Sequence, residues 1–296
     1  MTLGEKIKKL RTDKLMSQSE LAGSEITRNM LSQIEHGSAT PSLSTIKYIA
    51  SRLNVSVGFL LADEEDERLY LKRAEMDDIK KAYASKNFRL CYDMCKNFST
   101  SDDEITLILS ECSLRVGVEE LCKGNLRTAA EYLDEALLYC SESIYNTDSV
   151  EAEAASYFSY MELISPSLVS NVYDGVDGDQ IILIKNEFSI YSSIIFEAET
   201  RGWVEIDHLE ERINRLDGNS TYALHLIARD LMSKGEYDKA HDVLHSLLYK
   251  DDYDLPEPML YFIFCDIEIC CKEIDDFKGA YEYSASKMAL SQKLLA

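Results

Sequence analysis

Residues 17–41 constrain the fold more than any other part of the chain, because they carry signals for two short helices joined by a tight turn. Ser17 and Glu20 have the spacing of a capping box, in which two side chains accept backbone hydrogen bonds at a helix start. The sequence therefore predicts a short helix that begins near Gln18.

A second helix of about two turns is expected to follow the turn. Thr27 can cap it, Leu31 and Ile34 face inward, and Gly37 suits the left-handed residue that ends it. The opposite face presents four side chains able to form hydrogen bonds with base edges and phosphates: Arg28, Asn29, Ser32 and Gln33.

Similar signals surround this pair. Thr2 with Glu5, Ser42 and Ser56 can each cap a further helix with an apolar inner face, which gives five helices around one small core. Residues 3–61 resemble the DNA-binding domain of the phage-repressor (XRE) family at a set of spaced positions: Gln18, Leu21, Ala22, Ile26, Ser32, Glu35, Gly37, Pro41, Leu43, Ala50, Leu53 and Leu60.

The resemblance implies a helix-turn-helix domain that reads the major groove. Arg28 and Gln33 are the first candidates for base contact, followed by Asn29 and Ser32, with Thr27 at the start of the same helix. Gln18 is expected to hold a phosphate and, in this family, to brace the recognition residues. Glu35 is expected to be structural.

Composition extends the helical prediction to the whole chain. Its 296 residues are 46% hydrophobic with only 12 Gly and 4 Pro, which favours an all-α protein of two domains. Net charge is −22, but residues 1–60 hold eight Lys and Arg against five Asp and Glu. The basic balance thus coincides with the expected DNA-binding domain, and the acidic remainder is expected to face away from a duplex.

The chain starts with polar residues and has no apolar run long enough to cross a bilayer, so a cytoplasmic protein is expected. Its eight cysteines form no CxxC pair, and they read as reduced thiols in mostly buried positions. No cofactor or metal is expected.

The acidic segment 63–67 marks the predicted boundary between a DNA-binding domain over residues 1–62 and a second domain over 63–296; it is either a linker or a helix start. Beyond it, tight-turn sequences recur at helical-hairpin spacings, near residues 85–88, 123–126, 201–204, 234–237 and 274–277. Two copies agree closely, because small and apolar residues follow each turn glycine at offsets of 5, 9 and 12: Ala129, Leu133 and Ala136 after Gly124, and Ala240, Leu244 and Leu247 after Gly235.

This pattern resembles the tetratricopeptide (TPR) repeat and predicts about five hairpins in an α-solenoid, with breaks at Ser165-Pro166 and at residues 174–178. The first helices of such hairpins line a concave surface suited to a peptide or a partner helix. The residues expected there combine aromatic, apolar and hydrogen-bonding side chains: Ser189, Ser192, Phe196, Glu199, Tyr222, His225, Arg229 and Met232.

An XRE domain followed by TPR-like hairpins is similar to the Rgg and PlcR group of Gram-positive regulators. That resemblance implies a cytoplasmic homodimer that binds a palindromic operator in double-stranded DNA and takes part in quorum sensing, with a short imported peptide as effector. An alternative is a TPR-type scaffold for a protein partner, in which DNA contact serves only for localisation. Two further alternatives are a zinc peptidase built on His241 and His245, and a redox sensor at Cys91 with Cys95 or at Cys270 with Cys271.

Overall fold

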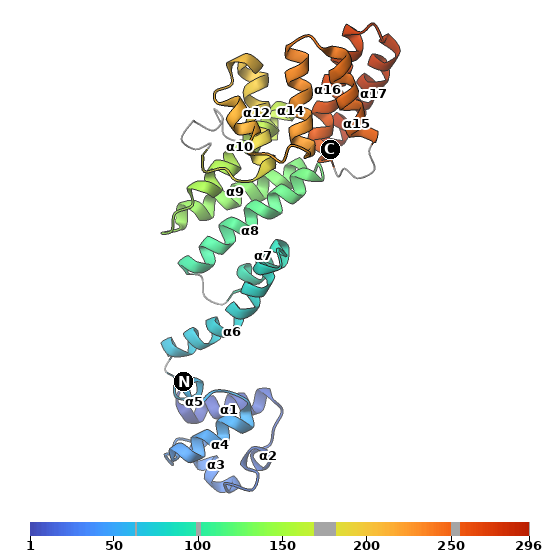
Figure 1. Cartoon of the computed structure of the whole chain (residues 1–296). Helices are drawn as coiled ribbons and strands as arrows, with labels where there is room; N and C mark the ends of the chain where they lie inside the picture. Colours follow the sequence, from blue (N-terminus) through green and yellow to red (C-terminus); the bar gives the residue numbers. More distant parts are fainter. Residues whose placement is uncertain (63, 99–101, 169–181, 250–254, 296) are drawn as a thin grey trace. The chain divides into compact units, whose positions relative to one another are not determined.

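The computed structural model describes residues 1–62, 64–98, 102–168, 182–249 and 255–295, and every regular element in these ranges is helical (Figure 1). The prediction of an all-α protein is confirmed. The chain divides into two compact units, residues 1–84 with 98–100 and residues 85–97 with 101–296.

The first unit contains six helices in its described residues: α1 (Leu3–Asp13), α2 (Gln18–Ala22), α3 (Arg28–Glu35), α4 (Leu43–Leu53), α5 (Val57–Leu61) and α6 (Glu64–Ala84). Helices α1 to α5 begin at the caps that the sequence predicts. Thr2, Ser17, Thr27, Ser42 and Ser56 each accept a hydrogen bond from the third residue after them. Local hydrogen bonding thus fixes where these helices start.

The small core of this unit draws on helices α1 to α5, with Ile7, Leu21, Leu31, Ile49 and Leu60 buried. Gly4 lets α1 approach the end of α3, because a Cβ atom there would lie 2.2 Å from the Ile34 carbonyl oxygen. The end of α3 therefore lies directly against the start of α1.

Helix α6 begins within the acidic segment that marks the predicted domain boundary. Of the two alternatives for the acidic segment, the helix start is the one found, since α6 begins at Glu64. The predicted boundary after residue 62 lies just before this helix, and the first compact unit continues to Ala84.

The second unit contains the remaining described helices: α7 (Phe88–Lys96), α8 (Asp103–Cys122), α9 (Leu126–Glu142), α10 (Asp148–Ile164), η1 (Pro166–Leu168), α12 (Glu187–Arg201), η2 (Trp203–Glu205), α13 (Leu209–Ile213), α14 (Thr221–Ser233), α15 (Tyr237–Tyr249), α16 (Glu257–Glu273) and α17 (Phe277–Leu294). Helices α8 and α9, α14 and α15, and α16 and α17 form hairpins. Their turns use left-handed residues at Gly124 (φ 82°), Gly235 (φ 76°) and Asp275 (φ 63°).

The repeat positions predicted after the two turn glycines pack as expected. Ala129, Leu133 and Ala136 are fully buried in the hairpin of α8 and α9. Ala240, Leu244 and Leu247 hold the same places in the hairpin of α14 and α15. Small residues at the first offset let the paired helices approach closely.

The middle of the solenoid departs from the repeat. After Gly202 the chain forms the short η2 and α13 in place of a full second helix. Arg212 of α13 is buried and donates to Glu197 at 2.7 Å, so this segment is held by polar contacts. Ser165-Pro166 ends α10 as predicted, whereas the predicted break at residues 174–178 lies outside the described residues.

Candidate functional site

Helices α2 and α3 form the candidate nucleic-acid site of the first unit. The Thr27 hydroxyl accepts from the backbone N–H of Met30 at 3.1 Å, and Gly37 adopts the predicted left-handed conformation (φ 71°) beyond the end of α3. The predicted helix of about two turns is therefore present with both ends defined.

The inner face of α3 is braced by a buried carboxylate. Glu35 accepts from Arg11 Nε at 2.7 Å and Nη2 at 3.1 Å, and from Gln18 Nε2 at 2.7 Å. Burial alone would raise the pKa of Glu35, but the hydrogen bonds from Arg11 and Gln18 outweigh it and the pKa is lowered. Glu35 thus joins the start of α2, the end of α3 and helix α1, which agrees with its predicted structural role.

The outer face of α3 carries the side chains predicted to contact DNA. Thr27, Arg28, Asn29 and Gln33 are exposed, and Ser32 is half-buried. Gln18 is half-buried and directs its amide nitrogen to Glu35. The structure therefore brings the predicted set together on two adjoining helices.

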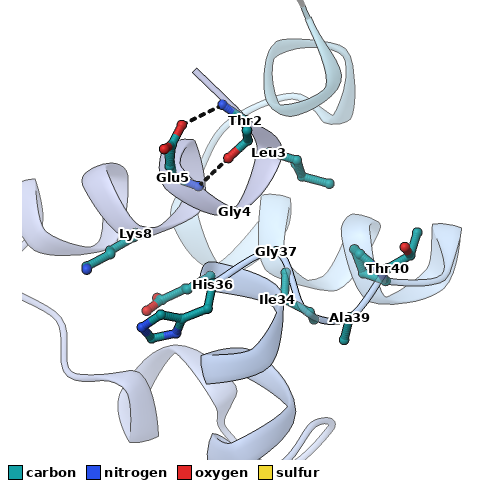
Figure 2. A pocket seen from close by; sticks show the side chains of 12 residues that line it. Thr2, Leu3, Gly4, Glu5, Lys8, Ile34, His36, Gly37, Ala39 and Thr40 are labelled. Atoms are coloured by element: carbon teal, nitrogen blue, oxygen red, sulfur yellow. Dashed lines mark hydrogen bonds between the residues drawn. The ribbon is translucent and has the colours of Figure 1, made fainter.

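A groove of about 650 Å³ lies at the end of α3 away from Thr27 (Figure 2). The start of α1 forms one side, and the turn from His36 to Pro41 forms the other. Figure 2 shows the capping box of Thr2 and Glu5 at this edge, with Lys8 on the next turn of α1. Gly4 is one of the residues that line this groove, and it lets the start of α1 contact the end of α3. This contact orients α3.

In the second unit, four side chains from three helices form a polar chain. Tyr191 Oη lies 2.7 Å from His225 Nδ1, and His225 Nε2 lies 2.8 Å from Asp266 Oδ2. Arg229 donates to both Asp266 oxygens, at 2.6 and 3.0 Å. Because a carboxylate only accepts, His225 carries its proton on Nε2 and accepts from Tyr191 at Nδ1.

Burial and charge act against each other within this network. Burial lowers the pKa of His225 despite the hydrogen bond to Asp266, so its imidazole is neutral. Burial would raise the pKa of Asp266, but the charge of Arg229 and the hydrogen bond from His225 outweigh it, and the pKa is lowered. The network therefore holds one buried ion pair with a neutral histidine beside it.

One end of the network reaches the surface. Arg229 Nη1 donates to Glu199 at 2.7 Å, and the Glu199 side chain is 41% exposed. Arg229 is thus bonded to two carboxylates at once.

An aromatic cluster fills the space beside the network. Phe188, Tyr191 and Tyr222 have ring centroids 5.3 to 6.3 Å apart, and Tyr160 packs against Phe262 at 5.1 Å. These rings come from α10, α12, α14 and α16. The four helices are therefore packed together by side chains at this point.

The residues predicted to line a groove accordingly fall into two groups. Ser189, Ser192 and His225 have no exposed surface, and Phe196 is buried. Tyr222, Arg229 and Met232 are half-buried, and Glu199 is exposed. In this conformation only the second group can touch a ligand.

Sequence reasoning missed Tyr191 and Asp266. The sequence did indicate Asp266, because an acidic residue within the apolar run of α16, which also contains Glu268, needs a partner when it is buried. No feature of the sequence indicated Tyr191, since tyrosine is common in buried apolar helices.

The two histidines of the alternative zinc-peptidase prediction lie on α15. His241 and His245 stack along α15 with ring centroids 5.9 Å apart, and His245 packs on Tyr249 at 4.3 Å. Within the described ranges, no group of three or more His, Cys, Asp or Glu side chains is placed to hold a metal ion. None of the helices described is both long enough and apolar enough to cross a membrane.

Comparison with known proteins identifies the first domain. Residues 7–60 match the helix-turn-helix family model. The immunity repressor protein of Bacillus phage phi105 is 31% identical over 86 residues, which are 27% of this chain. The chain spans 60% of the length of that repressor. The N-terminal part of the chain therefore contains a helix-turn-helix domain, and the chain is similar in part to this phage repressor.

Three of the solved structures found in the comparison align with nearly all of the chain at low sequence identity. PlcR of Bacillus thuringiensis, in complex with the peptide PapR7 and DNA, is 14% identical, with 99% of this chain and 98% of PlcR covered and a TM-score of 0.25. A PrgX mutant is 14% identical, with 97% and 98% covered and a TM-score of 0.31. The apo form of the competence regulator ComR from Streptococcus vestibularis is 18% identical, with 97% of each chain covered and a TM-score of 0.27.

Proposed function

We propose that this chain is a sequence-specific DNA-binding transcriptional regulator that dimerises and whose helical repeats bind an effector, a short peptide. The observation that carries the proposal is the braced α3. Its inner face is held by Glu35 through Arg11 and Gln18, while Arg28, Asn29 and Gln33 project outward. A rigid helix with an exposed polar row is what base recognition in a major groove requires.

The distribution of charge agrees with this assignment. Residues 1–60 carry three more basic than acidic side chains, whereas the rest of the chain is strongly acidic. Phosphates attract the first part and repel the second, so the duplex should meet the protein only at the helix-turn-helix domain.

The direct test is selection of genomic DNA fragments from the source organism by the purified full chain. We expect wild type to enrich an inverted repeat, and Arg28→Ala combined with Gln33→Ala to lose that enrichment. Lys239→Ala, an exposed change on α15, is the control and should enrich the same repeat. No enriched sequence with wild type at moderate salt would contradict the proposal.

Arg28→Ala alone should weaken binding to the selected site by about 1–3 kcal/mol, because a bidentate contact to a base is lost. Titration of fluorescent duplexes measures this, with a scrambled duplex of equal length beside the cognate one. Specificity should relax at one base pair. An equal loss on both duplexes would make Arg28 a phosphate contact.

The proposed dimer contact lies on α17. Phe277, Tyr281, Met288 and Leu295 are 51–77% exposed, and the last three recur every seven residues on one face. Such a row suits packing against a second helix. In an antiparallel crossing near Ser284, Tyr281 of one protomer would lie opposite Met288 of its partner, so the same face serves both copies.

Tyr281→Glu combined with Met288→Glu should weaken dimerisation at least about tenfold, because two charges would be buried in an apolar contact. Analytical ultracentrifugation of the full chain measures the monomer–dimer constant. Lys278→Glu gives the same change in net charge on an exposed part of α17 and should leave the constant unchanged. A double variant as dimeric as wild type would place the interface elsewhere.

The effector proposal rests on the exposed end of the polar network. Tyr222 and Met232 are half-buried there, the Arg229 side chain is 10% exposed, and Glu199 occupies one side of the Arg229 guanidinium. Guanidinium groups bind carboxylates well. A peptide carboxylate would take the place of Glu199, while the aromatic and thioether side chains contact the rest of the peptide.

Panning of a random-sequence heptapeptide library on the full chain tests this site. Selected peptides should bind about tenfold more weakly when their C-terminal carboxylate is amidated. They should bind more tightly to Glu199→Gln, which removes the competing carboxylate, and unchanged to Glu205→Gln. Peptides indifferent to Glu199→Gln, or recovery of only a folded protein partner, would contradict the peptide site; the latter supports a scaffold.

A further inference from the structure

Three cysteine thiols meet where α7 packs on α8. Cys91 and Cys95 are the buried residues of α7, and Cys112 of α8 is fully buried beside them. At its contact with α8, helix α7 therefore buries two thiol side chains and no bulky apolar side chain. All eight cysteines of the chain are free thiols.

The three thiols contact one another through hydrogen bonds centred on Cys91. Hydrogen bonds from Cys112 and from Cys95 lower the pKa of Cys91, although burial opposes this. The pKa values of Cys95 and Cys112 are raised for the same reason, since they act as donors. Because Cys91 contacts both other thiols, its sulfur can accept a hydrogen bond from each of them when it ionises.

The other contacts of α7 combine ion pairs with an edge-on ring contact of Tyr92 with Tyr132, whose centroids lie 5.4 Å apart. Arg89 pairs with Glu120 at 2.5 Å, and Lys96 pairs with Glu135 at 2.7 Å, with the Arg and Lys side chains about 40% exposed. Exposed ion pairs contribute little to stability. Helix α7 is nine residues long, and a local opening of this helix would give a small oxidant access to the buried thiols.

We propose that Cys91 and Cys112 are a thiol–disulfide switch that a small hydroperoxide closes, covalently joining α7 to α8. The pairing follows from the placement of the three residues. Cys91 and Cys95 lie one turn apart on the same helix, where disulfide geometry is strained, whereas Cys91 and Cys112 make their hydrogen bond between the packed helices α7 and α8.

The reaction balances with one peroxide. The Cys91 thiolate attacks one peroxide oxygen, the O–O bond breaks, and the leaving hydroxide takes a proton to give water and a sulfenic acid. The Cys112 sulfur then attacks the Cys91 sulfur and displaces the hydroxyl, which leaves as a second water with the Cys112 proton. Two thiols lose two electrons, and the peroxide is reduced to two waters.

The position of the switch gives it a consequence for the fold. Helix α7 begins four residues after Ala84, where the first compact unit ends, and it is the first helix of the second unit. The disulfide would stop α7 from opening away from α8. Oxidation should therefore stiffen the start of the repeat domain.

The test uses the full chain treated with hydrogen peroxide, then N-ethylmaleimide, and digested with trypsin without reduction. Cleavage after Arg89, Lys96 and Arg115 separates residues 90–96 from residues 97–115, so a Cys91–Cys112 disulfide joins two peptides. Fragmentation in the mass spectrometer then identifies which cysteine of residues 90–96 is linked. We expect the two peptides joined through Cys91, and slower amide hydrogen exchange over residues 88–96.

Two variants complete the test. Cys112→Ser should abolish the joined peptides, whereas Cys122→Ser, a change of a half-buried cysteine on the same helix, should retain them. Mapping of wild type needs neither variant to fold. A disulfide between Cys91 and Cys95, sulfinic acid in place of any disulfide, or alkylation of all three thiols after peroxide would overturn the proposal.

Discussion

Replacing Asp266 with Ala should destabilise the second unit by about 3–5 kcal/mol, because it removes the carboxylate from a buried ion pair. Asp266 is 4% exposed and binds both His225 and Arg229. Without it, Arg229 keeps only the exposed Glu199 as a partner, and His225 Nε2 is left without an acceptor in an apolar interior.

Amide hydrogen exchange over α14 and α16 in the full chain measures this loss directly, since a chain of two units need not unfold in one step. Glu199→Ala is the matched control. It removes the other carboxylate bonded to Arg229, but from an exposed position, and should cost no more than about 1 kcal/mol. Equal effects of the two substitutions would contradict a buried, stability-determining role for Asp266.

The first unit was predictable in detail because its helices start at local signals. Thr27 and Ser42 cap the helices that follow them, and each interaction spans three residues. Such hydrogen bonds depend on neighbouring residues alone, so the sequence shows them directly. The exposed row from Arg28 to Gln33 follows from the same helix period.

The second unit was predictable as hairpins but not as a site. Turn glycines and the buried alanines at fixed offsets repeat along the sequence, whereas the contact of His225 with Asp266 joins residues 41 positions apart on α14 and α16. Periodicity places His225 on the inner face of its helix but says nothing of what faces it. Cys112 was missed beside Cys91 for the same reason, because only packing brings α7 onto α8.

The buried residues of the predicted groove show that packing between helices can override the exposure that a repeat pattern predicts. Ser192 occupies a position that faces the concave surface of a regular TPR hairpin, yet its hydroxyl donates to the Phe188 carbonyl oxygen and it is fully buried. The aromatic rings of Tyr160 and Phe262 pack against each other beside this part of α12. A ligand therefore meets the inner helices only at the half-buried edge around Arg229.

Glu35→Ala is expected to have the largest effect in the first unit, about 3–5 kcal/mol, because its carboxylate is fully buried and is the acceptor for two helices. Arg11 would keep its bond to the Met16 carbonyl oxygen but lose its charge partner, and the Gln18 amide would lose its acceptor. Hydrogen exchange over α2 and α3 in the full chain measures the loss.

Glu35→Gln removes the negative charge but keeps an acceptor oxygen. Its loss of stability therefore separates the contribution of the charge from that of the hydrogen bonds. The amide oxygen can still accept from one donor, so we expect a smaller loss than with Ala and a partial retention of operator binding. Exposed Glu25 serves as the control, since Glu25→Ala removes a carboxylate from the turn between α2 and α3 without any bond to Arg11 or Gln18. If Glu35→Ala left both the exchange rates and operator binding at the level of Glu25→Ala, α3 would not depend on this carboxylate, and the packing of Leu31 and Ile34 would have to hold it alone.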